Sequence, residues 1–353
     1  MLTVCLRIRL KERATIFVAA PLLRAACTDD RGTPAGLRSV LLFHHDAIKL
    51  SCRRHWEERR MKRIRILHET EYQYRQPVKF GPHRALIRPR EGHDVHIARA
   101  RVSIAPRATV RWLRDTYDNS IAILTFEEQS DKLRVSSEVD VDLYYDNPVE
   151  WPIAPFARSF PFQYPPEEHV DLMAYRLPSY PYDGETLLNW LGDLYAPGQV
   201  IGTFDLLGRL NTHIYQSLKY VHREEPGVQL PNETLRRGSG SCRDFAVLMM
   251  EAARYWGLGA RFVTGYIQMA EGQHGATHAW TEIYLPGAGW RGFDPTNDKL
   301  VGSEHISVAV AREQEKASPL SGYWEGPADA FRELKVAVQV VPAPRDSAGP
   351  GAA

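Results

Sequence analysis

Apolar and polar side chains begin to alternate with a period of two shortly after the first sixty residues. In residues 64–74, one side of the pattern carries two isoleucines, a histidine, a threonine and two tyrosines, whereas the other side is mostly charged or polar. Residues 133–143 repeat it, with leucine and valine opposite charged residues. This period is typical of strands with one buried face. With shorter strand candidates at 100–104 and 121–126, it predicts an N-terminal antiparallel β domain over residues 61–145.

Residues 146–182 break this pattern with eight prolines and several aromatic residues. Proline lacks a backbone donor and fixes the chain in an extended form. We therefore expect a linker packed over a surface, without helices or strands of its own. Its aromatic side chains could line a peptide or sugar groove, although such residues more often cover a core.

The period then changes to that of helices, which we expect at 184–195, 203–221 and 242–256. In the last of these, the apolar residues form one stripe, and Gly257 ends the helix. Strands follow at 260–269, 277–285 and 289–294, and a closing strand at 334–341. The predicted fold class is α+β, with the N-terminal β domain followed by a core over residues 183–342 and a disordered tail at 343–353.

Charge is spread unevenly along a chain with a net charge of +1. Residues 1–60 carry 12 basic and 6 acidic residues, so the remaining 293 residues carry 32 and 37. The main body is mildly acidic and has no basic stripe typical of nucleic-acid binding. There is no run of 18 apolar residues that would predict a membrane-spanning helix.

The four cysteines are Cys5, Cys27, Cys52 and Cys242. From Met61 onward Cys242 stands alone, so that part of the chain contains no internal disulfide. This favours a reducing, cytoplasmic compartment.

The first sixty residues show no sustained periodicity. An apolar stretch with basic residues ahead of it is interrupted by Pro21 and Arg24, and no clean cleavage site follows. Our preferred interpretation is that translation begins at Met61 and that residues 1–60 are a mispredicted extension. A disordered basic tail and a secretory leader remain the alternatives.

Cys242 stands at the start of the 242–256 helix, directly after a Gly-Ser-Gly-Ser sequence. Ser241 fits the N-cap position, and Asp244 fits the acidic partner of a capping box. The free amides and the helix dipole at that end favour a thiolate over a thiol. Gly238 and Gly240 allow a sharp turn that leaves the sulfur accessible. A cysteine at a helix start is nevertheless more often structural than nucleophilic, and Asp244 is better explained as a cap than as a catalyst.

A thiolate nucleophile needs a base and a group that orients the base. His278 and Asp294 lie on two strands that are joined by a short loop. A tight turn would put Asp294 on the wrong face, whereas a three-residue loop at 286–288 makes it a diagonal neighbour of His278. The more ordinary alternative is a surface histidine and an Asp-Pro turn.

Taken together, these segments resemble the bacterial transglutaminase-like superfamily. The matching sequences are the Cys-Arg-Asp-Phe helix start, "GARFVTGY", "HAWTEIY" and "GWRGFDPT", preceded by "YQYRQPVKFGPHRALIRPR", which is similar to the β domain found before this core in bacterial members. The resemblance covers residues 63–340. It implies a papain-like cysteine proteinase core with Cys242, His278 and Asp294 as a catalytic triad.

Two positions depart from the family pattern. Asp118 stands where members often have glycine before an asparagine, and "VAREQEKASP" lacks a glycine-arginine-aspartate run. Neither departure touches the triad, but both bear on loop shape and substrate.

No cofactor or metal is expected. By residue type alone, a metal site could be proposed from four histidines, His213, His222, His274 and His305. No two of them, however, have the spacing of metal ligands within one helix or strand. The expected partner is a peptide or protein substrate, with no nucleic acid and no membrane. The sequence does not fix the oligomeric state.

The chemistry implied is acyl transfer through a thioester, with the amide of Cys242 as the first candidate oxyanion donor. Attack by an amine would make the protein a transglutaminase, and attack by water a peptidase or amidase. We favour hydrolysis slightly. The alternative from another class is a non-catalytic peptide-binding or scaffolding module that retains the fold.

Overall fold

The computed structural model describes residues 6–9, 15–18, 61–144, 151–180, 184–223, 225–268 and 276–343. The chain divides into two compact units, Met1–Arg60 and Met61–Ala353. In the first unit, β1 (Leu6–Arg9) pairs antiparallel with β2 (Thr15–Val18). Our other predictions for residues 1–60, 145–150, 181–183 and 344–353 lie outside the described residues. Among the described residues, no helix is long and apolar enough to cross a membrane.

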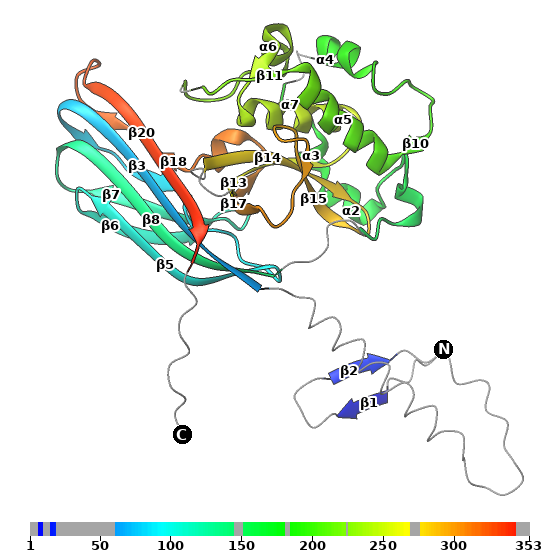
Figure 1. Cartoon of the computed structure of the whole chain (residues 1–353), viewed down its shortest axis with the longest axis horizontal. Helices are drawn as coiled ribbons and strands as arrows, with labels where there is room; N and C mark the ends of the chain where they lie inside the picture. Colours follow the sequence, from blue (N-terminus) through cyan, green and yellow to red (C-terminus); the bar gives the residue numbers. More distant parts are fainter. Residues whose placement is uncertain are drawn as a thin grey trace, which may run out of the picture. The chain divides into compact units, whose positions relative to one another are not determined.

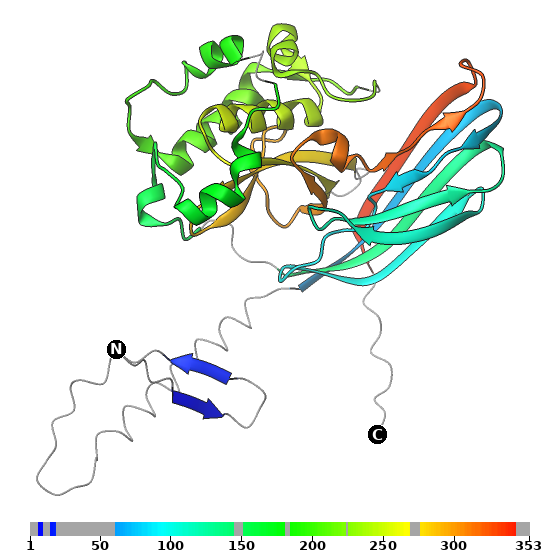
Figure 2. The ribbon, with the colours of Figure 1, turned by 180° about the vertical axis from the view of Figure 1, so that it is seen from behind.

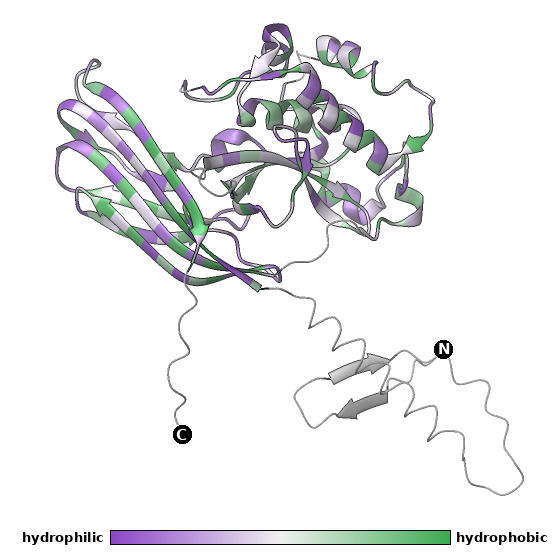
Figure 3. Ribbon diagram, in the orientation of Figure 1, coloured by the Kyte–Doolittle hydropathy of each residue, from purple (hydrophilic) through white to green (hydrophobic). Residues whose placement is uncertain are grey.

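The second unit begins with two antiparallel sheets that pack face to face (Figures 1 and 2). Alternate residues of the long strands point into the space between layers, so green and purple bands alternate along them in Figure 3. Tyr74, Leu124 and Val135 come from both sheets and share one buried cluster. One sheet contains β3 (Met61–Phe80), β5 (Val95–Ala105), β8 (Ser130–Tyr144), β19 (Trp324–Glu325) and β20 (Phe331–Pro342), and the other contains β4 (His83–Ala85), β6 (Ala108–Arg114), β7 (Ser120–Phe126) and β18 (Leu320–Ser321).

The C-terminal strand belongs to this sandwich, contrary to the sequence prediction that residues up to 342 complete the core. β20 pairs along β3, from Phe331 opposite Tyr74 to Pro342 opposite Ile64. The edge of β3 that β8 leaves free supplies the backbone groups that β20 needs. This pairing could not be predicted from the strand pattern, because the two strands lie far apart along the chain.

The prediction of a linker without elements is also wrong for the described part of residues 146–182. This stretch contains η1 (Pro155–Ala157), β9 (Ser159–Phe160), α2 (Pro166–Asp171) and α3 (Met173–Arg176). Pro166 occupies the first turn of α2, where a missing N–H costs nothing, and Glu167 and Glu168 complement the helix dipole. Proline here starts a helix instead of preventing one.

The core that follows is built on an antiparallel sheet in the order β16-β15-β14-β13-β17. Helix α7 (Cys242–Tyr255) lies across β13 and β14 (Figure 1). The predicted 203–221 helix ends at Ser217, because Lys219 and Tyr220 pair as a short strand with Ser239 and Gly240. The sheet strands are β13 (Ala260–Ile267), β14 (Ala276–Leu285), β15 (Gly289–Asp294), β16 (Lys299–Leu300) and β17 (His305–Ala311), and the remaining elements are α4 (Gly184–Leu191), β10 (Ile201–Gly202), α5 (Thr203–Ser217), β11 (Lys219–Tyr220), α6 (Pro231–Arg237), β12 (Ser239–Gly240) and η3 (Gln314–Ala317).

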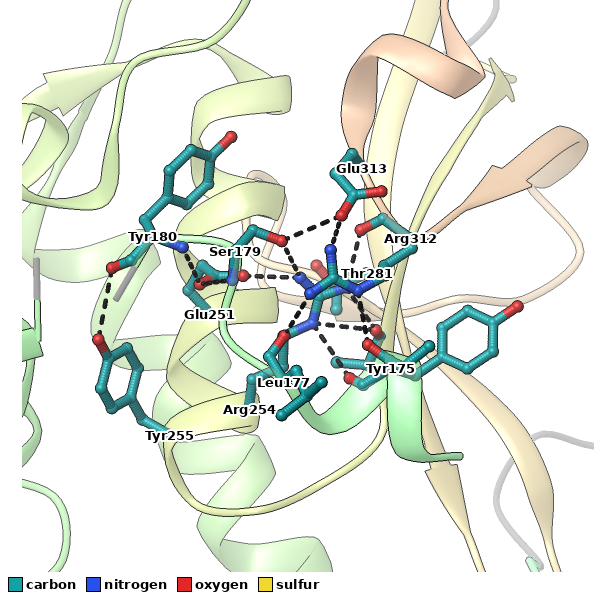
Figure 4. Close-up of polar contacts among 12 residues, drawn as sticks. Tyr175, Leu177, Ser179, Tyr180, Glu251, Arg254, Tyr255, Thr281, Arg312 and Glu313 are labelled. Atoms are coloured by element: carbon teal, nitrogen blue, oxygen red, sulfur yellow. Dashed lines mark hydrogen bonds and ion pairs between the residues drawn. The ribbon is translucent and has the colours of Figure 1, made fainter. Parts of the chain in front are cut away.

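A buried ion pair fixes the C-terminal half of α7 (Figure 4). The Arg254 and Glu251 side chains are both 0% exposed and lie 2.7 Å apart. Arg254 also donates to the carbonyls of Tyr175, Ala260 and Arg312, at 2.7–3.1 Å for the best contact with each. Glu251 accepts the N–H groups of Ser179 and Tyr180 at 2.8 and 3.2 Å. The pair thus joins α7 to three separate backbone segments.

We expect Arg254→Met to lower the free energy of unfolding by about 3–5 kcal/mol, because Glu251 would remain as an unpaired buried charge. Lys79→Met is the matched control, since the Lys79–Glu325 pair is solvent-exposed and such pairs contribute at most about 1 kcal/mol. Urea unfolding of both variants measures the difference. Equal losses would show that the buried pair does not anchor α7.

Asp118 precedes the asparagine that connects the sandwich to the core. Asn119 is fully buried, donates from Nδ2 to the Val310 carbonyl at 2.7 Å, and accepts the Val310 N–H at 2.9 Å. Asp118 has φ +62°, a left-handed conformation that glycine adopts freely and aspartate tolerates. The departure from the family pattern is therefore compatible with the loop's backbone.

We expect Asp118→Val to lower the free energy of unfolding by about 1–2 kcal/mol relative to Asp118→Gly, because a β-branched side chain is strained at this φ. Both variants lose the exposed ion pair with Arg114, so the difference isolates the backbone effect. Chemical denaturation of the two variants side by side provides the measurement. If valine is as stable as glycine, the left-handed conformation at Asp118 is incorrect.

Candidate active site

The first residue of α7 is Cys242, and a buried polar cluster holds the chain just before it. Asp244 is fully buried, and its Oδ2 accepts both the backbone N–H and the hydroxyl of Ser241 at 2.7 Å. Arg223 donates to both of its oxygens at 2.8 and 2.9 Å, and the Gln229 N–H donates at 2.7 Å. Asp244 is thus a capping residue, as the sequence predicted.

The glycines before Cys242 have separate structural roles. Gly238 ends α6 in a left-handed conformation with φ +62°. Gly240 lies so close to Asp244 that a Cβ atom there would come within 2.9 Å of the Asp244 Cβ. Larger residues would disturb the cap, and with it the position of Cys242, a partly buried residue.

His278 and Asp294 meet on the hairpin formed by β14 and β15. Leu285 pairs with Gly289 and Thr281 with Phe293, so the loop has the three residues 286–288 that the sequence argument required. The Nε2 atom of His278 lies 2.8 Å from Oδ2 of Asp294. Thr281, three residues further along β14, donates to the Ala246 carbonyl at 2.6 Å and ties this strand to α7.

The Cys242 side chain acts on His278 strongly enough to contribute to its raised pKa, so His278 is under the influence of both the thiol and Asp294. Burial lowers the pKa of His278, but hydrogen bonds and charge attraction from Asp294 and Cys242 outweigh burial and raise this pKa to about 10. For Asp294, burial acts to raise the pKa, but the bonds from His278 and His305 hold it well below its usual range. His278 therefore retains its proton at neutral pH beside an ionised Asp294.

Two neighbours of Asp294 were not expected at this site. The side-chain amide of Asn297 donates to Oδ2 at 2.7 Å, and Nε2 of His305 lies 3.0 Å from the same oxygen. The other oxygen accepts the backbone N–H groups of Thr296 and Asn297 at 3.0 and 3.3 Å. The signal for Asn297 was the Asp-Pro-Thr-Asn turn, whereas nothing near His305 in the sequence indicated this contact.

The turn after Asp294 is also held from α5. Asp298, with φ +50°, accepts from the Asn211 amide at 3.0 Å and the Thr212 hydroxyl at 2.8 Å. These contacts fix the segment that carries Asn297 and so support the environment of the carboxylate.

Trp280 and Gly265 complete the wall beside the two histidines. The Trp280 ring is buried and lies edge-on to His305, with ring centroids 5.3 Å apart. Gly265 is paired with His278, and a Cβ atom there would come within 2.1 Å of the Ile306 carbonyl oxygen and 2.7 Å of the Trp280 ring. Glycine therefore allows the tryptophan to pack under the site.

His278, Asp294 and His305 also satisfy a distance criterion for a metal site, since one potential ligand atom of each lies within 4.8 Å of the others. Of the four histidines considered from the sequence, this group contains His305, and His274 lies outside the described residues. The hydrogen bonds at 2.8 and 3.0 Å already account for the convergence of these atoms on Asp294.

Comparisons with known proteins agree with this architecture. Residues 64–142 match the bacterial transglutaminase-like N-terminal region, and residues 203–295 match the transglutaminase-like superfamily. The sandwich and the core of this chain are thus each similar to a region of transglutaminase-like proteins. The matched segments include Cys242, His278 and Asp294.

Proteins similar to this chain include uncharacterized protein Rv2569c of Mycobacterium tuberculosis, which is 27% identical over 279 residues, or 74% of this chain and 87% of the relative. Uncharacterized protein ML0607 of Mycobacterium leprae is 32% identical over 114 residues, or 31% of this chain and 39% of the relative. A solved structure from Cytophaga hutchinsonii, described as a candidate cysteine protease, aligns with a TM-score of 0.62 and 19% identity over 81% of this chain and 93% of its own. The structural likeness concerns the fold, and the superfamily match supports a thiol-dependent enzyme family.

We expect iodoacetamide to alkylate Cys242 faster in the folded protein than in urea at pH 6.5. The reason is that protonated His278 stabilises the thiolate, whereas an unperturbed thiol with a pKa of about 8.5 is almost fully protonated. Peptide mass spectrometry locates the label, and Cys242→Ser reports labelling of the other three cysteines. Equal rates in the folded and unfolded chains would contradict an activated thiol.

Proposed function

We propose that this protein is a thiol acyl-transfer enzyme that acts on amide bonds of peptides or proteins, with Cys242, His278 and Asp294 as its catalytic triad. The observation that carries the proposal is the position of His278, which lies 2.8 Å from Asp294 and whose pKa is raised by both Asp294 and Cys242. Because Nε2 is taken by Asp294, Nδ1 is the ring nitrogen available to the thiol. In this arrangement Cys242 would be the nucleophile, His278 the acid–base group and Asp294 the group that orients His278, as acyl transfer requires.

In the first half-reaction, the Cys242 thiolate attacks the carbonyl carbon of the amide and forms a tetrahedral oxyanion. The backbone N–H of Cys242, at the start of α7, is the proposed first donor to that oxygen. His278 then gives its proton to the nitrogen, the C–N bond breaks, and an amine or ammonia leaves. The product is a thioester on Cys242.

In the second half-reaction, neutral His278 takes a proton from the incoming nucleophile as that nucleophile attacks the thioester. Water gives a carboxylic acid and regenerates the thiolate–imidazolium pair, whereas a primary amine gives a new amide. We propose hydrolysis as the main outcome, so the enzyme is a peptidase or amidase. The same residues serve transamidation.

A reaction screen tests this assignment directly. The purified protein is incubated with glutamine-containing peptides, with and without a primary amine, while ammonia release, amine incorporation and peptide cleavage are measured. We expect products that are absent for Cys242→Ala. Amine incorporation would change the assignment to a transglutaminase, and tight peptide binding without turnover would replace it with a peptide-binding module.

We expect Asp294→Asn to lower kcat by about 10²–10³-fold. This loss is smaller than the roughly 10⁴-fold cost in serine triads, because a thiol is more acidic and more nucleophilic than a serine hydroxyl and needs less help from its base. KM is expected to change little. The substitution also removes the charge that raises the pKa of His278, so the alkaline fall in activity, near pH 10 in the wild type, moves to lower pH.

The double variant Asp294→Asn/His278→Ala provides the control for this prediction. The two effects should be strongly non-additive, since both act through one imidazole ring. If Asp294→Asn retains full activity while His278→Ala is inactive, Asp294 is only a residue of the strand end and has no role in orienting His278.

A further inference from the structure

A second histidine approaches the proposed triad from behind. His305 begins β17, and its side chain is 1% exposed. Its Nδ1 atom accepts the Gly302 N–H at 3.4 Å, which leaves the ring proton on Nε2. That Nε2–H points to Oδ2 of Asp294 at 3.0 Å, the same oxygen that lies 2.8 Å from Nε2 of His278.

We infer that His305 is a positioning residue for the proposed reaction, because it donates to the Asp294 oxygen that holds His278 and so fixes the carboxylate against that ring. The inference rests on the proposed function and extends it beyond the three triad residues. His305 is too deeply buried to bind substrate, and its closest polar contact is Asp294. Its effect must therefore pass through the carboxylate.

Two consequences follow from the shared oxygen. A donor on the far side stops the carboxylate from rotating away from His278, which preserves the ring orientation needed for proton transfer. It also draws charge from Oδ2, so the carboxylate holds the imidazolium proton less strongly. An imidazolium that is too basic would be slow to release its proton to the leaving amine.

The other groups around this cluster are accounted for among the described residues. Cys242 contacts His278 from α7, and Asn297 donates to Asp294 from the turn. Lys299 pairs with Asp294 in the strand ladder, but its ammonium bonds to Glu304 at 2.8 Å. The ring of Trp280 carries no charge. Removal of His305 therefore takes one donor from the carboxylate and leaves the contacts from His278 and Asn297 in place.

The test compares His305→Phe, which keeps a flat ring but no donor, with His305→Gln, whose side-chain amide can replace the Nε2–H donor. The first readout is the rate of Cys242 alkylation by the anion iodoacetate from pH 5 to 11. This rate needs no substrate and falls when the imidazolium loses its proton. For His305→Phe, we expect the fall to move up by about 0.5–1 pH unit, the effect of about one hydrogen bond. For His305→Gln, we expect it to stay at the wild-type position.

The second readout is steady-state turnover, in which His305→Phe should lower kcat by about tenfold and leave KM unchanged. His83→Phe is the matched control, because His83 is a buried histidine of the sandwich that bonds to the Gly81 carbonyl. It should shift neither readout. If His305→Phe does not fold, His305→Met fills the same space with an apolar side chain and without a donor.

The possible outcomes separate the two proposals. A wild-type profile without an alkaline fall would overturn the thiolate–imidazolium pair, and with it both proposals. A wild-type fall that His305→Phe and His305→Met leave in place or move to lower pH would overturn the role of His305 alone. Failure of His305→Gln to restore the wild-type position would also overturn it, because the donor would then not be the active feature.

Discussion

Two buried carboxylates set the position of helix α7, and the position of Cys242 depends on that helix. Asp244 at its start pairs with Arg223, and Glu251 in its last turns pairs with Arg254. A charge removed from water is costly unless it is paired and hydrogen-bonded. Arg223 and the Gln229 N–H therefore approach Asp244 from outside the helix, and the Ser179 N–H approaches Glu251, whose partner Arg254 belongs to α7 itself. Movement of either end of the helix would leave a buried carboxylate without its hydrogen bonds and its ion pair.

The register of the core sheet positions the other two residues of the site, His278 and Asp294. A three-residue loop between β14 and β15 places Asp294 on the face of His278. The connection from β15 to β17 then passes two intervening strands, since β14 and β13 lie between them in the sheet. His305, at the start of β17, thereby approaches a residue at the end of β15 that is not its neighbour in the ladder. The pairing of β14 with β15 places His278 beside Asp294, and the crossover to β17 places His305 beside the same carboxylate.

Local features were predictable from the sequence, and features that depend on distant segments were not. The cap at Asp244 and the helix behind Cys242 follow from spacing within a few residues, whereas the sequence left two loop lengths open between the strands of His278 and Asp294. The pairing of β20 with β3 depends on segments more than 200 residues apart, so a strand pattern could reveal the strand but not its sheet. The helix after Pro165 was missed because the prediction relied on the number of prolines in this stretch. It did not consider that proline is favourable in the first turn of a helix, where Pro166 lies.

His305 shows the same limit within the site. As a sequence residue it was one of several histidines without ligand spacing, and nothing in its own strand pointed to Asp294. In the fold, five donors from His278, His305, Thr296 and Asn297 surround the two oxygens of this carboxylate. A carboxylate offers about four lone-pair sites, so Asp294 is saturated without an ion. Such a group is suited to orientation more than to proton transfer, because each added donor fixes its direction while lowering its basicity. The hydrogen bonds to Asp294 account for the convergence of two histidines and one carboxylate, a geometry that also meets a distance criterion for a metal site.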